Sequence, residues 1–236
     1  MPTSHATRTV ALPDRRLLEF ADLGDPTGRP VVAFHGVVHA HPIWALADEA
    51  ARRHGIRLIA PDRPGYAGST PQPNRTILDG PHDLLVLVGA LGVSDFGVLT
   101  VAGGSVYGTA AAGCLRPMVR RLALVAPEAR EPTAWSAFRL GAAVRRDPWA
   151  AARRLLADRP VPDQQAFAAP ARQAVVVESL TLAFAEPGAA ALDARLQTLP
   201  WGRDGTTLPN ATRAWPGSPY LRMTEMAPVM AWLARG

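Results

Sequence analysis

The stretch "VLTVAGGSVYG" (98–108) joins a run of apolar residues to a run of small residues through a pair of glycines. The apolar part is typical of a buried strand, and the part from Ser105 onward is typical of the start of a helix. Gly103 and Gly104 allow a tight turn between the two. Such a turn at a sheet edge can hold a nucleophile. The residue at its tip, however, is Ala102, which has no reactive group.

The segments around this turn alternate between short apolar runs and helical sequence. The apolar runs are too continuous for half-exposed strands, so they predict buried parallel strands at 31–36, 57–62, 96–101 and 121–127. Helices closed by glycine are expected between them, at 43–55 and 84–92. This alternation predicts an α/β sheet with helices on both faces. An antiparallel edge strand with its turn is expected at 16–30.

Strand-like runs largely disappear between about Glu131 and Leu199, where the sequence is typical of helices. We therefore expect one domain with an inserted helical cap. One short apolar run (211–215) and a last helix (224–235) follow the cap. The first part of the core is expected at 1–130 and the cap at 131–199. The second part of the core is expected at 200–236.

The composition narrows the class of protein. Charged residues make up 19% of the chain and the formal net charge is +5, carried by arginines scattered through alanine-rich helical sequence. This distribution argues against a nucleic-acid-binding stripe. No apolar stretch is long enough to span a membrane, and the N-terminus lacks the apolar core of a signal peptide. With one cysteine, Cys114, no internal disulfide can form. We expect a cytoplasmic protein without a cofactor.

The order of the motifs resembles that of the α/β-hydrolase family over nearly the whole chain. "FHGVVHAHPIW" (34–44) corresponds to the family's His-Gly oxyanion loop, and "APDRPGYAGSTPQPNRT" (60–76) to the loop after the next strand. The stretch 98–108 corresponds to the nucleophile elbow. Residues 208–234 resemble the last strand, the catalytic-histidine loop and the terminal helix. The resemblance implies a mostly parallel sheet flanked by helices, with the 131–199 segment as the cap.

All three positions of the family's catalytic triad differ in this chain. Ala102 stands at the nucleophile position, and Tyr220 stands where the loop "PGSPY" (216–220) would carry the histidine. The acid should follow a penultimate strand, but only Thr206 to Asn210 separate the cap from the last strand. A strand with its crossover helix needs roughly 30 residues. We therefore expect one strand–helix unit to be missing near the C-terminus.

A triad that has moved to other residues is an alternative to the loss of the triad. Ser105 should lie one turn down the helix, where a serine is more typical of a helix N-terminus than of a nucleophile. Glu128 follows a predicted strand at a place where some family members keep their acid, but it needs a histidine partner. His39 and His41 could face the pocket or solvent, and both interpretations stay open. An "HxH" pattern without a third ligand does not predict a metal site.

The backbone could keep its function where the side chains have changed. The N–H groups of Gly103 and of Val37 or Val38 are expected to form an oxyanion hole that polarises a carbonyl or holds an enolate. Tyr220 is either a general acid or a packing residue in the space of the missing histidine. The predicted pocket is apolar and suits a hydrophobic ligand; its further expected residues are His35, Ala102, Ser105, Tyr107 and Trp135.

The leading hypothesis is a non-hydrolytic enzyme that binds an apolar carbonyl-containing metabolite. It would promote a cyclisation, elimination or isomerisation, as in natural-product biosynthesis, with Tyr220, Glu128, His39 and His41 as catalytic candidates. The first alternative is an inactive ligand-binding relative of the hydrolases. The second is a hydrolase whose triad is rebuilt on Ser105 and Glu128. The shortened sheet edge is also a place that a second copy of the chain could cover in a homodimer.

Overall fold

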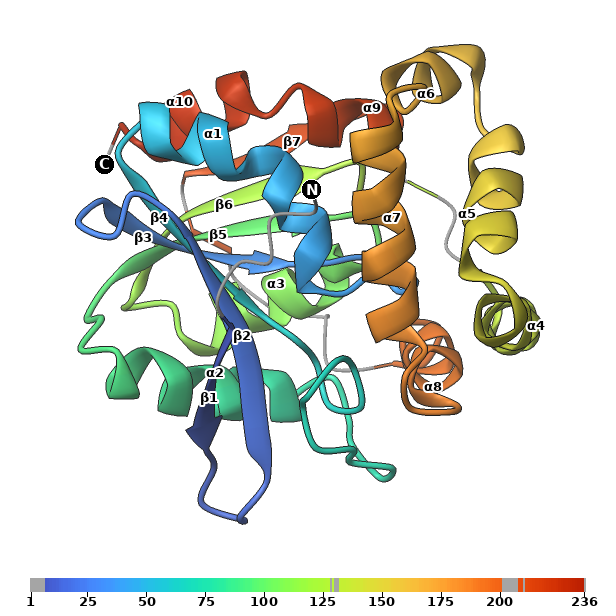
Figure 1. Cartoon of the computed structure of the whole chain (residues 1–236). Coiled ribbons are helices and arrows are strands. Elements are labelled where there is room, and N and C mark those ends of the chain that lie inside the picture. Colours follow the sequence, from blue (N-terminus) through green and yellow to red (C-terminus); the bar gives the residue numbers. More distant parts are fainter. Residues whose placement is uncertain (1–6, 128, 130–131, 201–207, 210, 236) are drawn as a thin grey trace.

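The computed structural model describes residues 7–127, 129, 132–200, 208–209 and 211–235. They form a seven-stranded sheet of order β1-β2-β4-β3-β5-β6-β7 (Figure 1). Strands β4, β3, β5, β6 and β7 are parallel, while β1 and β2 are antiparallel to their neighbours. The strands are β1 (Thr7–Ala11), β2 (Leu17–Gly24), β3 (Arg29–Phe34), β4 (Ile56–Pro61), β5 (Phe96–Val101), β6 (Val119–Val125) and β7 (Thr212–Trp215).

The sequence prediction of a mostly parallel α/β sheet is confirmed. Each strand expected from a continuous apolar run is present, with ends shifted by a few residues. The antiparallel strand expected as the sheet edge is β2, but it is not the edge. β1 pairs with its outer side through Thr7–Ala11, so the prediction of its place was wrong.

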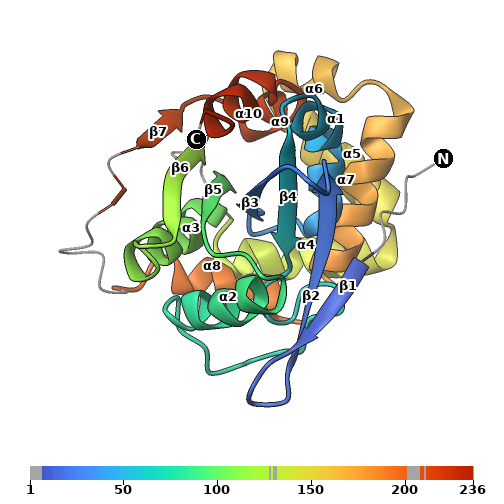
Figure 2. The same cartoon turned by 90° about the vertical axis from the view of Figure 1, so that its left-hand side faces the viewer.

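Apolar side chains on the two faces of the central strands form two separate cores. On β3, Val31 and Ala33 belong to one core, and Val32 and Phe34 to the other. This follows from the period of two in a strand. Helices α1 and α10 cover the first face, and α2 and α3 cover the second (Figures 1 and 2). Both faces are therefore covered, as a parallel sheet requires.

Helices α1 to α3 join the strands, α4 to α8 lie between β6 and β7, and α9 and α10 end the chain. Figure 1 shows the α4–α8 group together at one end of the sheet. These helices lie inside the expected cap, whose boundaries remain a prediction. The helices are α1 (Ala45–Arg53), α2 (Asp79–Ala90), α3 (Gly104–Cys114), α4 (Ala134–Arg146), α5 (Pro148–Ala157), α6 (Val161–Ala166), α7 (Pro170–Ala183), α8 (Ala189–Leu196), α9 (Pro219–Thr224) and α10 (Ala227–Leu233), with a 3₁₀ turn η1 (His41–Trp44) before α1.

The last strand, β7, pairs directly with β6, with Leu122 opposite Thr212 and Val125 opposite Trp215. Within the described ranges, no other strand lies between them in the sheet. This agrees with the expected loss of one strand–helix unit. No described helix has both the length and the apolar character to cross a lipid bilayer.

The turn between β5 and α3 keeps the shape of a nucleophile elbow. Ala102 has a φ of 49°, in the left-handed region, and its N–H donates to Val125 O at 2.9 Å. A side chain at Gly104 would place its Cβ 2.2 Å from Phe34 O, so only glycine fits there. A left-handed alanine costs on the order of 1–3 kcal/mol. The sequence-predicted strand, tight turn and helix are therefore all present.

Candidate active site

A cavity of about 420 Å³ lies between the cap and the end of the sheet. The loop after β3, the β5–α3 turn, helices α4 and α5 and the start of α9 all contribute to its wall. Apolar side chains such as Val101, Leu140, Leu155 and Met223 make up most of this wall. Four predicted pocket residues, Val37, Val38, Ala102 and Tyr220, line it together with His39, one of the catalytic candidates.

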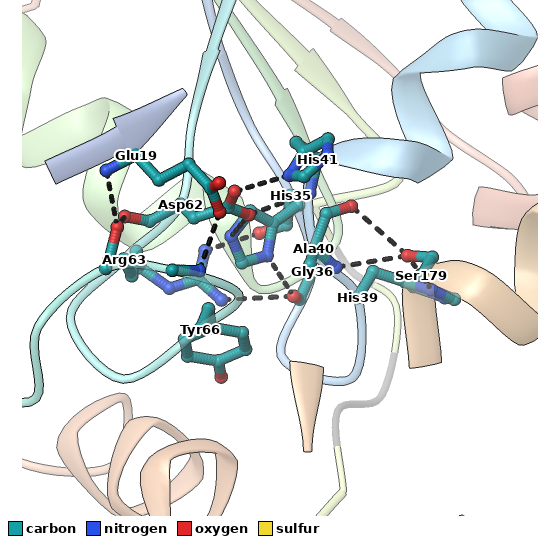
Figure 3. A network of polar contacts seen from close by, with 12 residues as sticks. Glu19, His35, Gly36, His39, Ala40, His41, Asp62, Arg63, Tyr66 and Ser179 are labelled. Atoms are coloured by element: carbon teal, nitrogen blue, oxygen red, sulfur yellow. Dashed lines mark hydrogen bonds and ion pairs between the residues drawn. The ribbon is translucent and has the colours of Figure 1, made fainter. Parts of the chain in front are cut away.

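His39 and Tyr220 are in direct contact in this cavity. His39 Nε2 lies 3.0 Å from the Tyr220 hydroxyl, and both side chains are buried. The other ring nitrogen, Nδ1, lies 3.2 Å from the hydroxyl of Ser179 on α7. Ser179 accepts a hydrogen bond from Ala40 N–H at 3.0 Å and lies 3.1 Å from Ala40 O (Figure 3). A polar chain therefore runs from the cap through His39 to Tyr220.

Two proton arrangements satisfy this chain. In the first, the Ser179 hydroxyl donates to Ala40 O, His39 Nδ1–H donates to Ser179, and Tyr220 donates to Nε2. In the second, Ser179 donates to Nδ1 and the Nε2–H of His39 donates to the Tyr220 oxygen. In this second arrangement, the Tyr220 hydroxyl does not donate its proton to His39. Hydroxyl hydrogens rotate to suit either arrangement, and the imidazole tautomer determines which arrangement is present.

His39 is a neutral imidazole at physiological pH. Burial, and to a smaller extent the nearby positive charge of Arg159, together lower its pKa to about 3. Burial disfavours the charged form because the low-dielectric interior replaces water. His39 is therefore suited to donate or accept a hydrogen bond, and not to carry a proton as a cation.

The loop before His39 contributes two residues to the wall of the cavity. Val37 and Val38 both line it, and within the described parts of the chain neither N–H has a hydrogen-bond partner. The loop's shape is fixed from behind, because the Tyr66 hydroxyl donates to Val37 O at 2.8 Å. Buried N–H groups almost always find an acceptor. A ligand oxygen would supply one here.

His41 does not line this cavity, and its role as a catalytic candidate stays a prediction. Its Nδ1 lies 2.5 Å from Asp62 Oδ2, and its backbone N–H donates to Asp62 Oδ1 at 2.8 Å (Figure 3). Burial alone would lower the pKa of His41, but the hydrogen bond and charge of Asp62 outweigh it and raise the pKa. Glu19 completes a group that could hold a metal ion. One of its oxygens already accepts from Gly68 N–H at 2.6 Å.

A buried ion network ties the cap to the core. Asp193 on α8 is fully buried and accepts from Arg63 Nε and an Arg75 NH₂ group at 2.5 Å each. The Tyr107 hydroxyl donates to it at 2.8 Å. Burial alone would raise the pKa of Asp193, but the two guanidinium groups lower it to about 2. The carboxylate is therefore charged at physiological pH and holds α8 in place.

The sequence identifies the family to which this fold and this site belong. The sequence matches the family described as "Alpha/beta hydrolase family" over residues 31–235. The chain belongs to the α/β-hydrolase family. A search of curated protein sequences found no match.

Solved structures of other α/β hydrolases share the fold across nearly the whole chain. The enol-lactonase from Burkholderia xenovorans LB400 is similar with a TM-score of 0.71 at 16% identity, covering 95% of this chain and 96% of that one. An epoxide hydrolase, CorEH, gives 0.67 at 15% identity, covering 96% and 95%. An α/β-hydrolase fold protein from Nakamurella multipartita gives 0.62 at 20% identity, covering 95% and 87%. At these identities the likeness shows the fold.

Three predicted pocket residues lie outside the cavity of this α/β hydrolase. The Trp135 side chain is 68% exposed and stacks on Phe138, because its position on α4 turns it to solvent. Tyr107 points to Asp193 on the other side of the turn. His35 is completely buried, and its Nδ1 contacts Gly36 O at 2.9 Å, so it supports the loop from within.

Gly103 and Ser105 line a neighbouring pocket that shares Ala102, Ala129, Pro132 and Thr133 with the cavity and extends to the end of α8. Neither residue lines the cavity itself, and their predicted place in the site stays a prediction. Ser105 lies 3.1 Å from the Thr100 hydroxyl, and no described histidine contacts it. Glu128 lies outside the described residues. The described surroundings of Ser105 therefore contain no base for a relocated triad.

Two residues of the site were missed by the sequence analysis. Ser179 is a polar residue within the apolar run of α7, and its complete burial could have been inferred from that position. Arg159, between α5 and α6, lines the cavity. Nothing in the sequence distinguishes it from the many other arginines of the cap.

The fold is expected to lose stability as pH falls from 7 to 5.5. Burial holds the pKa values of His35 and His39 well below the ordinary 6.5 or so, so the unfolded chain binds protons that the folded chain does not. Each group can then cost up to about 1.4 kcal/mol per pH unit. His41, with a raised pKa, binds its proton more readily in the folded state and therefore opposes part of the loss as pH falls from 7 past about 6.5. Asp62, whose pKa burial raises, opposes the loss at the acid end.

Denaturant unfolding at pH 7, 6.3 and 5.5 measures this loss of stability. A His39→Asn variant serves as the control, and its stability should depend less steeply on pH than that of the parent. Equal stability of the parent at all three pH values would contradict the assignment of two neutral buried histidines.

Proposed function

We propose that this α/β hydrolase catalyses a non-hydrolytic proton transfer on an apolar carbonyl compound. The observation that carries the proposal is the His39–Tyr220 contact of 3.0 Å in a cavity whose nucleophile position is Ala102. The reaction class is enolisation, the step shared by isomerisations, eliminations and many cyclisations. The family's catalytic serine and histidine are replaced, and a proton-transfer pair stands in their place.

The carbonyl oxygen of the ligand is held by the N–H groups of Val37 and Val38. As the α-proton leaves, negative charge develops on that oxygen, and fixed N–H donors stabilise it. The Tyr220 hydroxyl first loses its proton to solvent, and the tyrosinate so formed removes one proton from carbon. The resulting hydroxyl then returns one proton to the same or a neighbouring carbon. Proton number is conserved over the cycle.

His39 keeps the tyrosinate in place. In the neutral tautomer with the proton on Nε2, it donates to the Tyr220 oxygen and stabilises its anion. Ser179 fixes the ring from the other side. Because burial keeps the pKa of His39 at about 3, the imidazole does not compete as a cation.

Hydrolysis is disfavoured by the same contacts. Ala102 offers no nucleophile, and both ring nitrogens of His39 are already engaged, by Ser179 and Tyr220. A water molecule would therefore find no free imidazole nitrogen to activate it. The apolar wall around the reacting group also favours a hydrophobic ligand.

Exchange of α-protons for deuterium tests the proposal. 2-Decanone, methyl 4-oxodecanoate and 4-oxodecanoate are incubated with the protein in D₂O and followed by NMR. At least one should exchange about 10² times faster than in buffer, the low end of acid–base catalysis. Absence of exchange for all three would contradict the proposal and favour an inactive binding protein.

A second test of the proposal measures ester hydrolysis, which we expect to be absent. We expect 4-nitrophenyl octanoate to be cleaved no faster than by an Ala102→Phe variant, in which the cavity is filled. A fluorophosphonate probe should leave Ser105 unlabelled. Labelling of Ser105 would instead support the relocated triad.

A further inference from the structure

Arg159 is the charged group that faces the cavity. It follows α5, and of the cavity residues in the described ranges it alone carries a formal charge. The remaining wall is apolar or carries neutral polar groups. An arginine in such a wall needs an explanation, because a charge beside apolar surface is stabilised only by a partner or by water.

The Arg159 guanidinium lies over the Tyr220 ring, but it has no anionic or hydrogen-bonding partner within the described chain. Its Nε is buried without a hydrogen bond, and no described acceptor takes a hydrogen bond from its side chain. The buried arginines Arg63 and Arg75 differ in this respect, since both pair with Asp193. Arg159 is only half-buried, so part of its side chain is open to solvent, while its buried Nε has no acceptor among the described residues.

The position of Arg159 places this free charge beside the proposed reaction. Its Cζ lies 5.0 Å from the centre of the Tyr220 ring, so the guanidinium stacks over the ring face. Its charge also contributes to the low pKa of His39. A group bound to Arg159 therefore lies at the same end of the cavity as the Tyr220 hydroxyl.

We propose that Arg159 binds a carboxylate of the ligand, so that the ligand is an apolar keto acid. The planar fork of N–H donors matches the two oxygens of a carboxylate. A carboxylate also fits the charge of this site, because one guanidinium neutralises one negative charge whereas a phosphate would bring more. The inference rests on the proposed function for the carbonyl group, and goes beyond it in naming a second, anionic group close to that carbonyl.

Calorimetric titration with 4-oxodecanoate and its methyl ester tests the inference. The two ligands differ in charge and share the ketone and the tail. The wild type should bind the acid at least tenfold more tightly than the ester. In Arg159→Gln the acid should lose that preference, while the ester binds as in the wild type. Arg159→Lys should retain part of the preference, because it keeps the charge and loses the fork.

The control is Arg154→Gln, which removes an exposed arginine of α5, the cap helix that Arg159 follows. It should leave both affinities within twofold of the wild type, and circular dichroism confirms that each variant is folded. The inference would be overturned if the wild type bound acid and ester equally or bound neither saturably. It would also be overturned if the preference for the acid survived Arg159→Gln. Because binding is measured without turnover, an acid preference without deuterium exchange would refute the proposed reaction and leave the carboxylate site standing.

Discussion

An Asp193→Ala variant is expected to unfold with a free energy about 3–5 kcal/mol below that of the wild type. The substitution leaves the guanidinium groups of Arg63 and Arg75 buried without their carboxylate. It also leaves the Tyr107 hydroxyl without its acceptor. Removing one partner of a buried ion pair costs more than the pair itself contributes, because the remaining charge cannot be solvated.

Urea unfolding measured by fluorescence gives the difference. The matched control is Glu49→Ala, which breaks an exposed pair with Arg53 in which both side chains are more than half exposed. That variant should change stability by less than about 1 kcal/mol. Asp193→Asn keeps the shape and one acceptor, so we expect an intermediate loss. An Asp193→Ala protein within 1 kcal/mol of wild type would show that Asp193 does not hold the cap.

A Tyr220→Phe variant is expected to lower kcat for α-proton exchange by about 10²–10⁴-fold, the range of general acid–base catalysis. KM should change little, because the ring keeps its edge contact with Phe167 and its place beneath Arg159. A loss confined to kcat identifies an interaction made in the transition state. The rates come from NMR on the ketone that exchanges fastest with the wild type.

A His39→Phe variant tests how much the contact with His39 supports Tyr220. It removes the hydrogen bond to Tyr220 and keeps a ring in the same space. We expect a smaller fall in kcat than for Tyr220→Phe, because His39 supports the tyrosinate and does not itself touch the moving proton. Trp135→Phe, an exposed change on α4, is the inert control. A Tyr220→Phe protein with at least a third of the parent's kcat would instead assign Tyr220 a packing role.

The backbone of the site could be predicted from sequence because local patterns determine it. The apolar run 96–101 and the following glycines specify β5 and the elbow, and Gly104 is required by its approach to Phe34 O. That no described strand lies between the cap and β7 was expected from the few residues that the chain leaves there. Tyr220 and Ala102 could be placed in one cavity because both fill positions that the family brings together.

The polar partners could not be predicted, because they depend on contacts between distant segments. His39 meets Ser179, which lies 140 positions away, through the packing of α7 on the loop after β3. His41 turns to Asp62 instead of the cavity, a choice of side-chain direction that an "HxH" pattern does not contain. The direction of Trp135 on α4 and the free guanidinium of Arg159 likewise depend on how the cap is seated.

The left-handed Ala102 has a consequence for how such a chain changes over evolution. Its conformation is maintained by the hydrogen bond to Val125 O and by Gly104 against Phe34, none of which involves a side chain at 102. Gaining or losing a hydroxyl at this position is therefore nearly neutral for the fold. Regaining a whole triad is different, since Tyr220 is engaged with His39 and β7 already occupies the place beside β6. Under the proposed function, a serine at position 102 would therefore return more readily than the other members of a triad.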